Sequence, residues 1–108
     1  FYLFCRQKGI WLHEVTGHEP EDEGWFAGYE PIRNVSPSYP PTMLLHGELD
    51  TDIPFEQSVM MQLELARHGV AHEFLPNPNW GHTFLYMPDD DSVGEAFAAI
   101  VSFLQEHV

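Results

Sequence analysis

The order of apolar and polar positions predicts a strand, a helix and a second strand in the middle of the chain. The run 42–45 is continuously apolar after two prolines, which is typical of a parallel strand covered on both faces. From Pro54 to Gly69, apolar residues recur at spacings of four and three, which predicts a helix with Val59, Leu63 and Ala66 on its apolar face. A further apolar run at 70–75 predicts the second strand. Because strand–helix–strand crossovers are nearly always right-handed, we expect the two strands to be parallel.

The last segment has the clearest helical pattern. Ser92 and Glu95 have the spacing of a capping box at a helix start. The apolar residues behind them fall on one helical stripe, which we expect to pack on the sheet. This stripe consists of Val93, Ala96, Phe97, Ile100, Val101 and Leu104.

The first 41 residues have a weaker pattern. Residues 1–12 mix apolar and basic side chains and predict a short helix broken near Gly9. The polar stretch 13–29 has four glycines or prolines and predicts an irregular loop, and the four prolines of 30–41 predict an extended, stiff segment. We therefore interpret 1–108 as a single partial α/β domain, with a loop-rich lead-in at 1–41 and a strand–helix–strand–helix portion at 42–108.

The candidate chemistry lies in the loops that follow the two predicted strands. Asp50 lies in the first loop, and His82 lies in the second. Loops at the carboxyl ends of parallel strands emerge at the same edge of a sheet, so these two residues are expected to meet, with Asp50 closer to His82 than Asp52 is. A carboxylate beside an imidazole fixes the tautomer of the ring, and the imidazole can then take a proton from a nucleophile.

Each of these residues also has a structural interpretation. Asp50 and Asp52 can bind the local backbone or cap the following helix, and for Asp52 we favour the cap. His82 can be an ordinary surface residue of its loop. His46, at the end of the first strand, is interpreted as a structural hydrogen-bonding residue rather than a second base.

Three motifs in this region resemble a known family. They are His46-Gly47-x-x-Asp50-x-x-Ile53-Pro54, Gln57-Ser58 and Trp80-Gly81-His82-Thr83-Phe84. Together they resemble the C-terminal part of the α/β-hydrolase fold, in the branch of prolyl-oligopeptidase-like serine peptidases (peptidase S9 type) and related esterases. The resemblance implies a three-layer sandwich of parallel strands and flanking helices. It also implies a serine hydrolase of peptide or ester bonds, with Asp50 as the triad acid and His82 as the triad base.

The nucleophile of such a triad is missing from the sequence. None of the serines lies in a Gly-x-Ser-x-Gly elbow: they are Ser36, Ser38, Ser58, Ser92 and Ser102. Cys5 has no glycine turn beside it and is typical of a small buried residue. We therefore expect a C-terminal fragment, inactive alone, that supplies the acid and base of a larger enzyme, and the first residue, which is not Met, agrees with this. The alternative is a non-catalytic remnant of the fold or an interaction domain.

Composition limits the other function classes. The 17 acidic and 4 basic residues give a net charge of −13, which disfavours nucleic acid and anionic membranes as partners and fits either a salt-adapted surface or an ordinary acidic domain. No apolar window is long enough to span a membrane. One cysteine forms no intrachain disulfide, so the cytoplasm is the default location.

We expect neither a cofactor nor a metal. The strongest metal candidates are His13 and His18, with Glu14 and Glu19 beside them, but their spacing matches no compact zinc pattern and favours solvated loop histidines. The expected partner is a peptide or ester substrate. Association with another copy of the chain, or with the missing N-terminal part, is left open.

Overall fold

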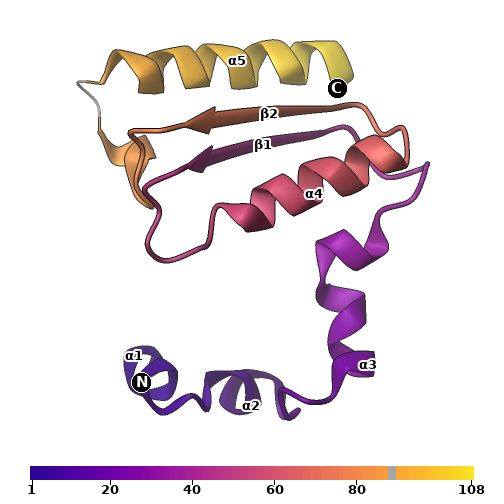
Figure 1. Cartoon of the computed structure of the whole chain (residues 1–108), viewed down its shortest axis with the longest axis vertical. Coiled ribbons are helices and arrows are strands. Elements are labelled where there is room, and N and C mark those ends of the chain that lie inside the picture. Colours follow the sequence, from indigo (N-terminus) through magenta and orange to yellow (C-terminus); the bar gives the residue numbers. More distant parts are fainter. Residues whose placement is uncertain (88–89) are drawn as a thin grey trace. The chain divides into compact units, whose positions relative to one another are not determined.

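The computed structural model describes residues 1–87 and 90–108. The chain forms two compact units, Phe1–Asn34 and Val35–Val108, and each is considered by itself. The second unit contains both strands (Figure 1), and both candidate triad residues lie within its range.

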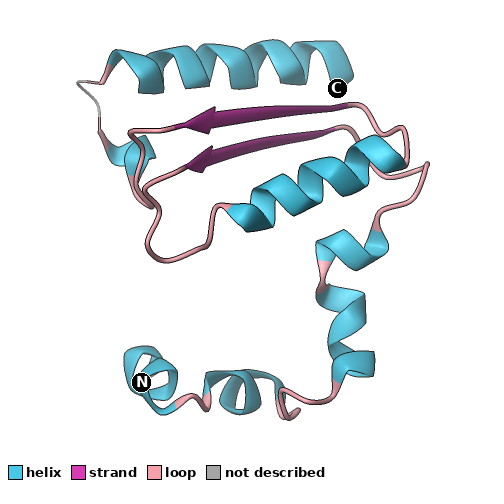
Figure 2. Ribbon diagram, viewed as in Figure 1, coloured by secondary structure: helices cyan, strands magenta, loops and turns pink. Residues whose placement is uncertain are grey.

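The second unit is built on two parallel strands, as the sequence predicts. Strand β1 (Thr42–Gly47) pairs with β2 (His72–Asn77) in a register that runs from Thr42 opposite His72 to Gly47 opposite Asn77. Helix α4 (Glu56–Arg67) connects them and begins two residues after the predicted start at Pro54. Both arrowheads point to the same edge, so the loops that follow the strands emerge together (Figure 2).

Helices cover the two strands on both faces. Helix α4 lies on one side, and α5 (Asp91–His107) lies on the other (Figure 1). Successive side chains of a strand point to opposite faces, and accordingly Leu44 and Leu45 pack against different core clusters. The cluster at Leu44 consists of Val35, Leu65 and Val70, and the cluster at Leu45 consists of Trp80, Phe84, Val93 and Ala96. The prediction of a strand covered on both faces is confirmed.

The predicted details of α5 are partly wrong. Its N-cap is Asp90, whose side chain accepts a hydrogen bond from the backbone N–H of Ser92, so Ser92 and Glu95 do not form the expected capping box. The predicted apolar stripe is only partly buried, because the two strands contact only part of the helix circumference. Val93, Ala96 and Phe103 are buried, whereas Phe97, Val101 and Leu104 are about half exposed.

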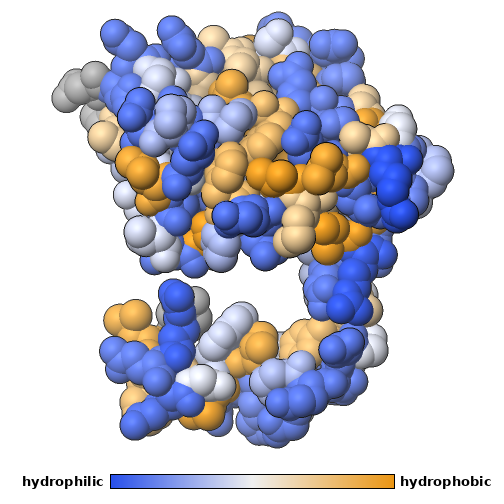
Figure 3. Space-filling view, viewed as in Figure 1, coloured by the Kyte–Doolittle hydropathy of each residue, from blue (hydrophilic) through white to orange (hydrophobic). Residues whose placement is uncertain are grey.

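Helix α4 also buries a different face from the one predicted. Leu65 is fully buried and Met61 packs beside it, whereas Leu63 is 62% exposed. The helix has two apolar series, one at Met61 and Leu65 and one at Val59 and Leu63, and spacing alone does not tell which faces the sheet. Apolar side chains therefore gather on the surface over α4 (Figure 3). Within the two described segments, no helix combines the length and the apolar character of a membrane span.

The first unit is helical where the sequence predicts a loop. Helix α1 (Tyr2–Lys8) ends at Gly9, as predicted. The predicted irregular loop and the start of the predicted extended segment are instead short helical elements: α2 (Trp11–Thr16), α3 (Glu23–Phe26) and 3-10 turns at Ala27–Tyr29 and Pro31–Asn34. The turn residues mark helix ends instead. Gly17 ends α2 in the left-handed conformation (φ 75°), and the side chain of Asp22 caps α3.

Candidate active site

The two candidate triad residues meet at the carboxyl edge of the strands. Nδ1 of His82 lies 3.0 Å from Oδ2 of Asp50, although 32 positions separate the residues in the chain. Asp52 is farther away, with its Oδ2 3.8 Å from Nε2 of the same ring. The predicted juxtaposition of Asp50 and His82, and the order of the two distances, are confirmed.

Backbone contacts hold the two loops together. The N–H of Leu49 donates to the carbonyl oxygen of Trp80 at 3.0 Å, and the N–H of Glu48 donates to Asn77 at 2.9 Å. Gly47 lies against Trp80 so closely that a Cβ on it would be 2.0 Å from the Trp80 carbonyl oxygen. The first loop therefore requires glycine at position 47 to bring Asp50 to the second loop.

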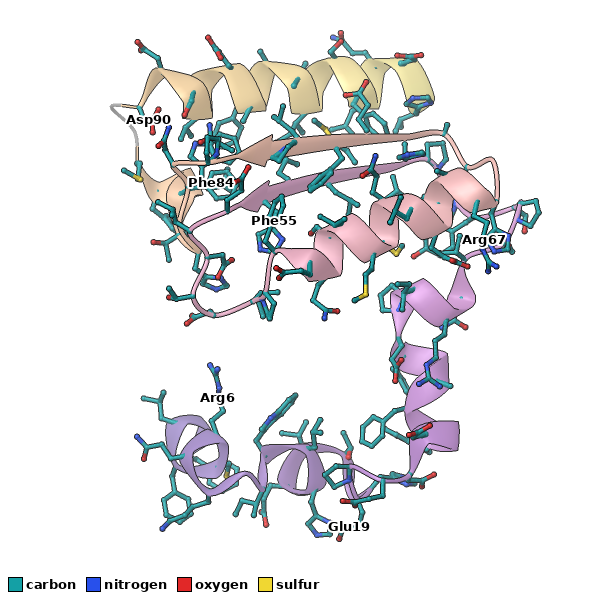
Figure 4. The ribbon with its side chains drawn as sticks, in the orientation of Figure 1. Arg6, Glu19, Phe55, Arg67, Phe84 and Asp90 are labelled. Atoms are coloured by element: carbon teal, nitrogen blue, oxygen red, sulfur yellow. The ribbon has the colours of Figure 1, made fainter. Side chains whose placement is uncertain are left out.

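Trp80 fixes the His82 loop to the body of the unit. The indole is 2% exposed and stacks on Phe84 with ring centroids 4.1 Å apart. Its Nε1–H donates to Oγ of Ser92 at 2.8 Å, and that hydroxyl donates to Oδ1 of Asp90 at 2.6 Å. Phe84 and Asp90 lie at the same end of the strands (Figure 4). The position of the imidazole thus depends on the start of α5, a link that sequence spacing does not reveal.

The carboxylate of Asp50 is buried and well supplied with donors. Its side chain is 7% exposed, and Oδ1 accepts from the backbone N–H groups of Asp52 (2.8 Å) and Ile53 (2.9 Å). The Ile53 N–H, His82 and the Asp52 N–H hold the pKa of Asp50 far below its ordinary value of 3.8, whereas burial opposes them. Asp50 is therefore ionised at neutral pH and can only accept hydrogen bonds.

Asp50 makes the local backbone contacts of its structural interpretation and also contacts His82. One of its oxygens binds the local backbone, and the other faces His82. Asp52 does not cap α4, because the N-cap residue is Phe55, whose side chain makes no capping hydrogen bond. The expected cap is wrong because Asp52 lies three positions before the N-cap, and its own N–H binds Asp50.

His46 is the buried polar residue beside this pair. Its Nδ1 lies 2.7 Å from Oγ of Ser58, and its Nε2 lies 3.2 Å from the carbonyl oxygen of Ile53. The expected structural role is confirmed, but Nε2 also lies 3.3 Å from Oδ2 of Asp50, which sequence reasoning missed. Phe55 contacts the His46 ring edge-on and lies between β1 and the start of α4 (Figure 4).

The histidines of the first unit form separate pairs. Nδ1 of His13 lies 3.0 Å from Glu19, and Nδ1 of His18 lies 2.9 Å from Asp22. Within residues 1–87 and 90–108, no group of three or more His, Cys, Asp or Glu side chains forms a metal-binding cluster. Trp25 stacks on His18, and Cys5 is buried as expected.

Comparison with solved structures places the fold. One similar structure is a truncated form of a carbohydrate esterase from gut microbiota: it has 22% identity, covers 82% of this chain and 31% of that chain, and gives a TM-score of 0.66. Another is an acetyl ester-xyloside bifunctional hydrolase from Caldicellulosiruptor lactoaceticus: it has 26% identity, covers 81% of this chain and 34% of that chain, and gives a TM-score of 0.59. The chain thus spans about a third of each solved chain. The expected partial α/β-hydrolase fold is confirmed.

The family assignment comes from the sequence. No curated protein matches the chain. The profile of the prolyl oligopeptidase family (peptidase S9), however, matches residues 6–108, which include both strands, both loops and the two long helices. Because that match extends over nearly the whole sequence, the chain belongs to the prolyl oligopeptidase family of serine hydrolases.

Proposed function

We propose that this chain supplies the acid and the base of a Ser-His-Asp triad, with Asp50 as the acid and His82 as the base. The observation that supports the proposal is the 3.0 Å contact between Asp50 Oδ2 and His82 Nδ1, made by residues from two different loops. A contact of this kind needs the whole strand–helix–strand unit to form.

The proton positions follow from the charge of Asp50. An ionised carboxylate only accepts, so the proton of His82 lies on Nδ1 and points at Asp50. Nε2 is then the basic nitrogen. It removes the proton of a serine hydroxyl as the oxygen attacks a carbonyl carbon, and Asp50 stabilises the imidazolium that forms. The His82 side chain is 47% exposed, so a hydroxyl from another segment can approach it.

The nucleophile is proposed to come from sequence outside residues 1–108. The sequence has no nucleophile elbow, and the hydroxyls of Ser58 and Ser92 already bind His46 and Trp80. The substrate class is a peptide or an ester, because the family is one of peptidases and the similar structures are esterases. Both reactions form an acyl-enzyme on the serine while the amine or alcohol leaves with the proton that His82 took up, and water then hydrolyses the acyl-enzyme. This chemistry uses no cofactor.

A serine-directed fluorophosphonate probe tests the proposal. The 108-residue chain alone should not be labelled, and it should not turn over nitrophenyl esters. The protein from the complete reading frame should do both. There, His82→Ala should lower kcat roughly 10⁴- to 10⁶-fold, because the base and the nucleophile act as a unit.

The matched control is His18→Ala, because His18 makes a similar carboxylate contact in the other unit. It should leave turnover unchanged. Strong labelling of the isolated chain, or full turnover by the His82→Ala protein, would contradict the proposal. A complete protein that neither reacts nor turns over ester or peptide substrates would favour the alternative, a non-catalytic member of the fold.

A further inference from the structure

A second histidine lies behind the proposed triad acid. His46 is 7% exposed, at the end of β1, and both of its ring nitrogens have protein partners. Nδ1 faces Ser58 on α4, and Nε2 lies between the carbonyl oxygen of Ile53 and Oδ2 of Asp50. The ring therefore bridges the loop that holds the acid, from the strand before it to the helix after it.

The partners of His46 determine where its proton lies. The Ile53 carbonyl and the ionised Asp50 carboxylate both only accept, so Nε2 must be the nitrogen with the hydrogen. In the neutral form of the ring, Nδ1 is then the acceptor, and the Ser58 hydroxyl donates to it at 2.7 Å. The Ser58 hydroxyl thus selects the neutral tautomer whose Nε2–H donates to the Ile53 carbonyl and lies beside Oδ2 of Asp50.

We propose that His46, with its tautomer fixed by Ser58, is a positioning residue for Asp50. This inference rests on the proposed function, because the geometry that it serves is the contact between Asp50 and His82. His46 acts through the carboxylate and does not touch the reacting atoms.

The carboxylate geometry gives the reason. A carboxylate has about four lone-pair sites. In Asp50, two backbone N–H groups donate to Oδ1 and His82 donates to Oδ2, and Nε2 of His46 lies 3.3 Å from the same Oδ2 as an ion-pair contact. The two backbone N–H groups and His46 belong to the Asp50 loop and its flanking strand, whereas His82 belongs to the other loop and is 47% exposed. His46 therefore keeps Oδ2 directed at His82 when the His82 ring moves.

The tautomer of His82 gives a direct test in the 108-residue chain. Two-bond ¹H–¹⁵N spectra of the ¹⁵N-labelled chain at about pH 8, where imidazoles are neutral, report which ring nitrogen holds each proton. The wild type should show Nε2–H on His46 and Nδ1–H on His82. In His46→Leu, the ratio of Nδ1–H to Nε2–H on His82 should fall about two- to tenfold, the range expected for one lost hydrogen bond. His46→Gln, which keeps an N–H donor, should restore it.

Ser58→Ala provides an independent variant if His46→Leu does not fold. It should reduce the Nε2–H form of His46 and, through Asp50, the Nδ1–H form of His82. Unchanged His82 tautomers in the folded His46→Leu chain, or in Ser58→Ala, would overturn the positioning role while leaving the triad proposal intact. A wild-type chain without Nδ1–H on His82 would instead overturn the triad geometry itself, so the two failures are distinguishable.

Discussion

Two histidine–carboxylate pairs in this protein have nearly the same contact distance. Nδ1 of His82 lies 3.0 Å from Asp50 in the second unit, and Nδ1 of His18 lies 2.9 Å from Asp22 in the first. By distance alone, either pair is a candidate acid and base. Their surroundings differ in ways that bear directly on catalysis.

The Asp22 pair is local and exposed. Its residues are four positions apart, the Asp22 side chain is 48% exposed, and its other oxygen caps a single helical turn. Exposed pairs of this kind contribute about 0 to 1 kcal/mol to stability. Asp50 is 7% exposed, and its carboxylate accepts from two N–H groups of its own loop and from His82 of the other loop. The comparison shows that burial and a complete set of donors distinguish a candidate triad acid, because they hold a carboxylate ionised and in one orientation.

The largest expected difference between the pairs is in activity. In the protein from the complete reading frame, Asp50→Asn should lower kcat about 10⁴-fold, because the amide supports the wrong tautomer of His82. Asp22→Asn should leave kcat unchanged. Nitrophenyl ester or peptide turnover measures both. Equal activities of the two variants would remove the functional distinction between the pairs.

The two pairs should also differ in how much a Gly→Ala substitution beside them changes the free energy of unfolding. Gly47→Ala places a Cβ 2.0 Å from the Trp80 carbonyl oxygen, so the loops of Asp50 and His82 must move apart. We expect a loss of about 1–3 kcal/mol in the free energy of unfolding, typical of overpacking. Gly24→Ala, next to the Asp22 pair, has open space within 4 Å and should be neutral or slightly stabilising.

Urea unfolding of the two glycine variants measures this difference. The Gly47→Ala chain should also lose the Nδ1–H signal of His82, because the contact with Asp50 depends on the loops staying together. A Gly47→Ala chain as stable as Gly24→Ala would show that the close approach to Trp80 is relieved without cost.

The sequence predicts the second unit better than the first for a physical reason. Parallel strands bury continuous apolar runs, and one helix must cross between them, so strand order, direction and the meeting of Asp50 with His82 all follow from pattern. In the first unit, the same glycine and aspartate signals mark short helices rather than a loop. Short helices have little apolar periodicity, so the sequence does not separate these two outcomes.

Contacts between side chains distant in the sequence were the main part of the site that could not be predicted. The hydrogen bonds of Trp80 with Ser92 and of His46 with Ser58 depend on how α5 and α4 pack on the strands. Ser92 has the spacing of a capping box, and only the structure shows that Asp90 caps the helix instead. Hydroxyl and imidazole groups have too many local partners for spacing to select one.

The smallest expected effect is on how the free energy of unfolding falls as the solution is made acidic. In the folded chain, Asp50 stays ionised to a much lower pH than in the unfolded chain, where the pKa of its carboxyl group is near 3.8. The ionised Asp50 therefore stabilises the folded chain fully above pH 3.8, and this stabilisation is lost as the pH falls from 3.8 toward the pKa of Asp50 in the folded chain. Asp50→Asn should show a shallower loss of stability than the wild type as the pH falls through 3.8, because the variant has no carboxylate at this position to protonate. Asp22→Asn, from the exposed pair, should follow the wild-type slope in the same urea titrations. A wild-type slope in Asp50→Asn would mean that the backbone N–H groups and His82 do not favour the ionised carboxylate.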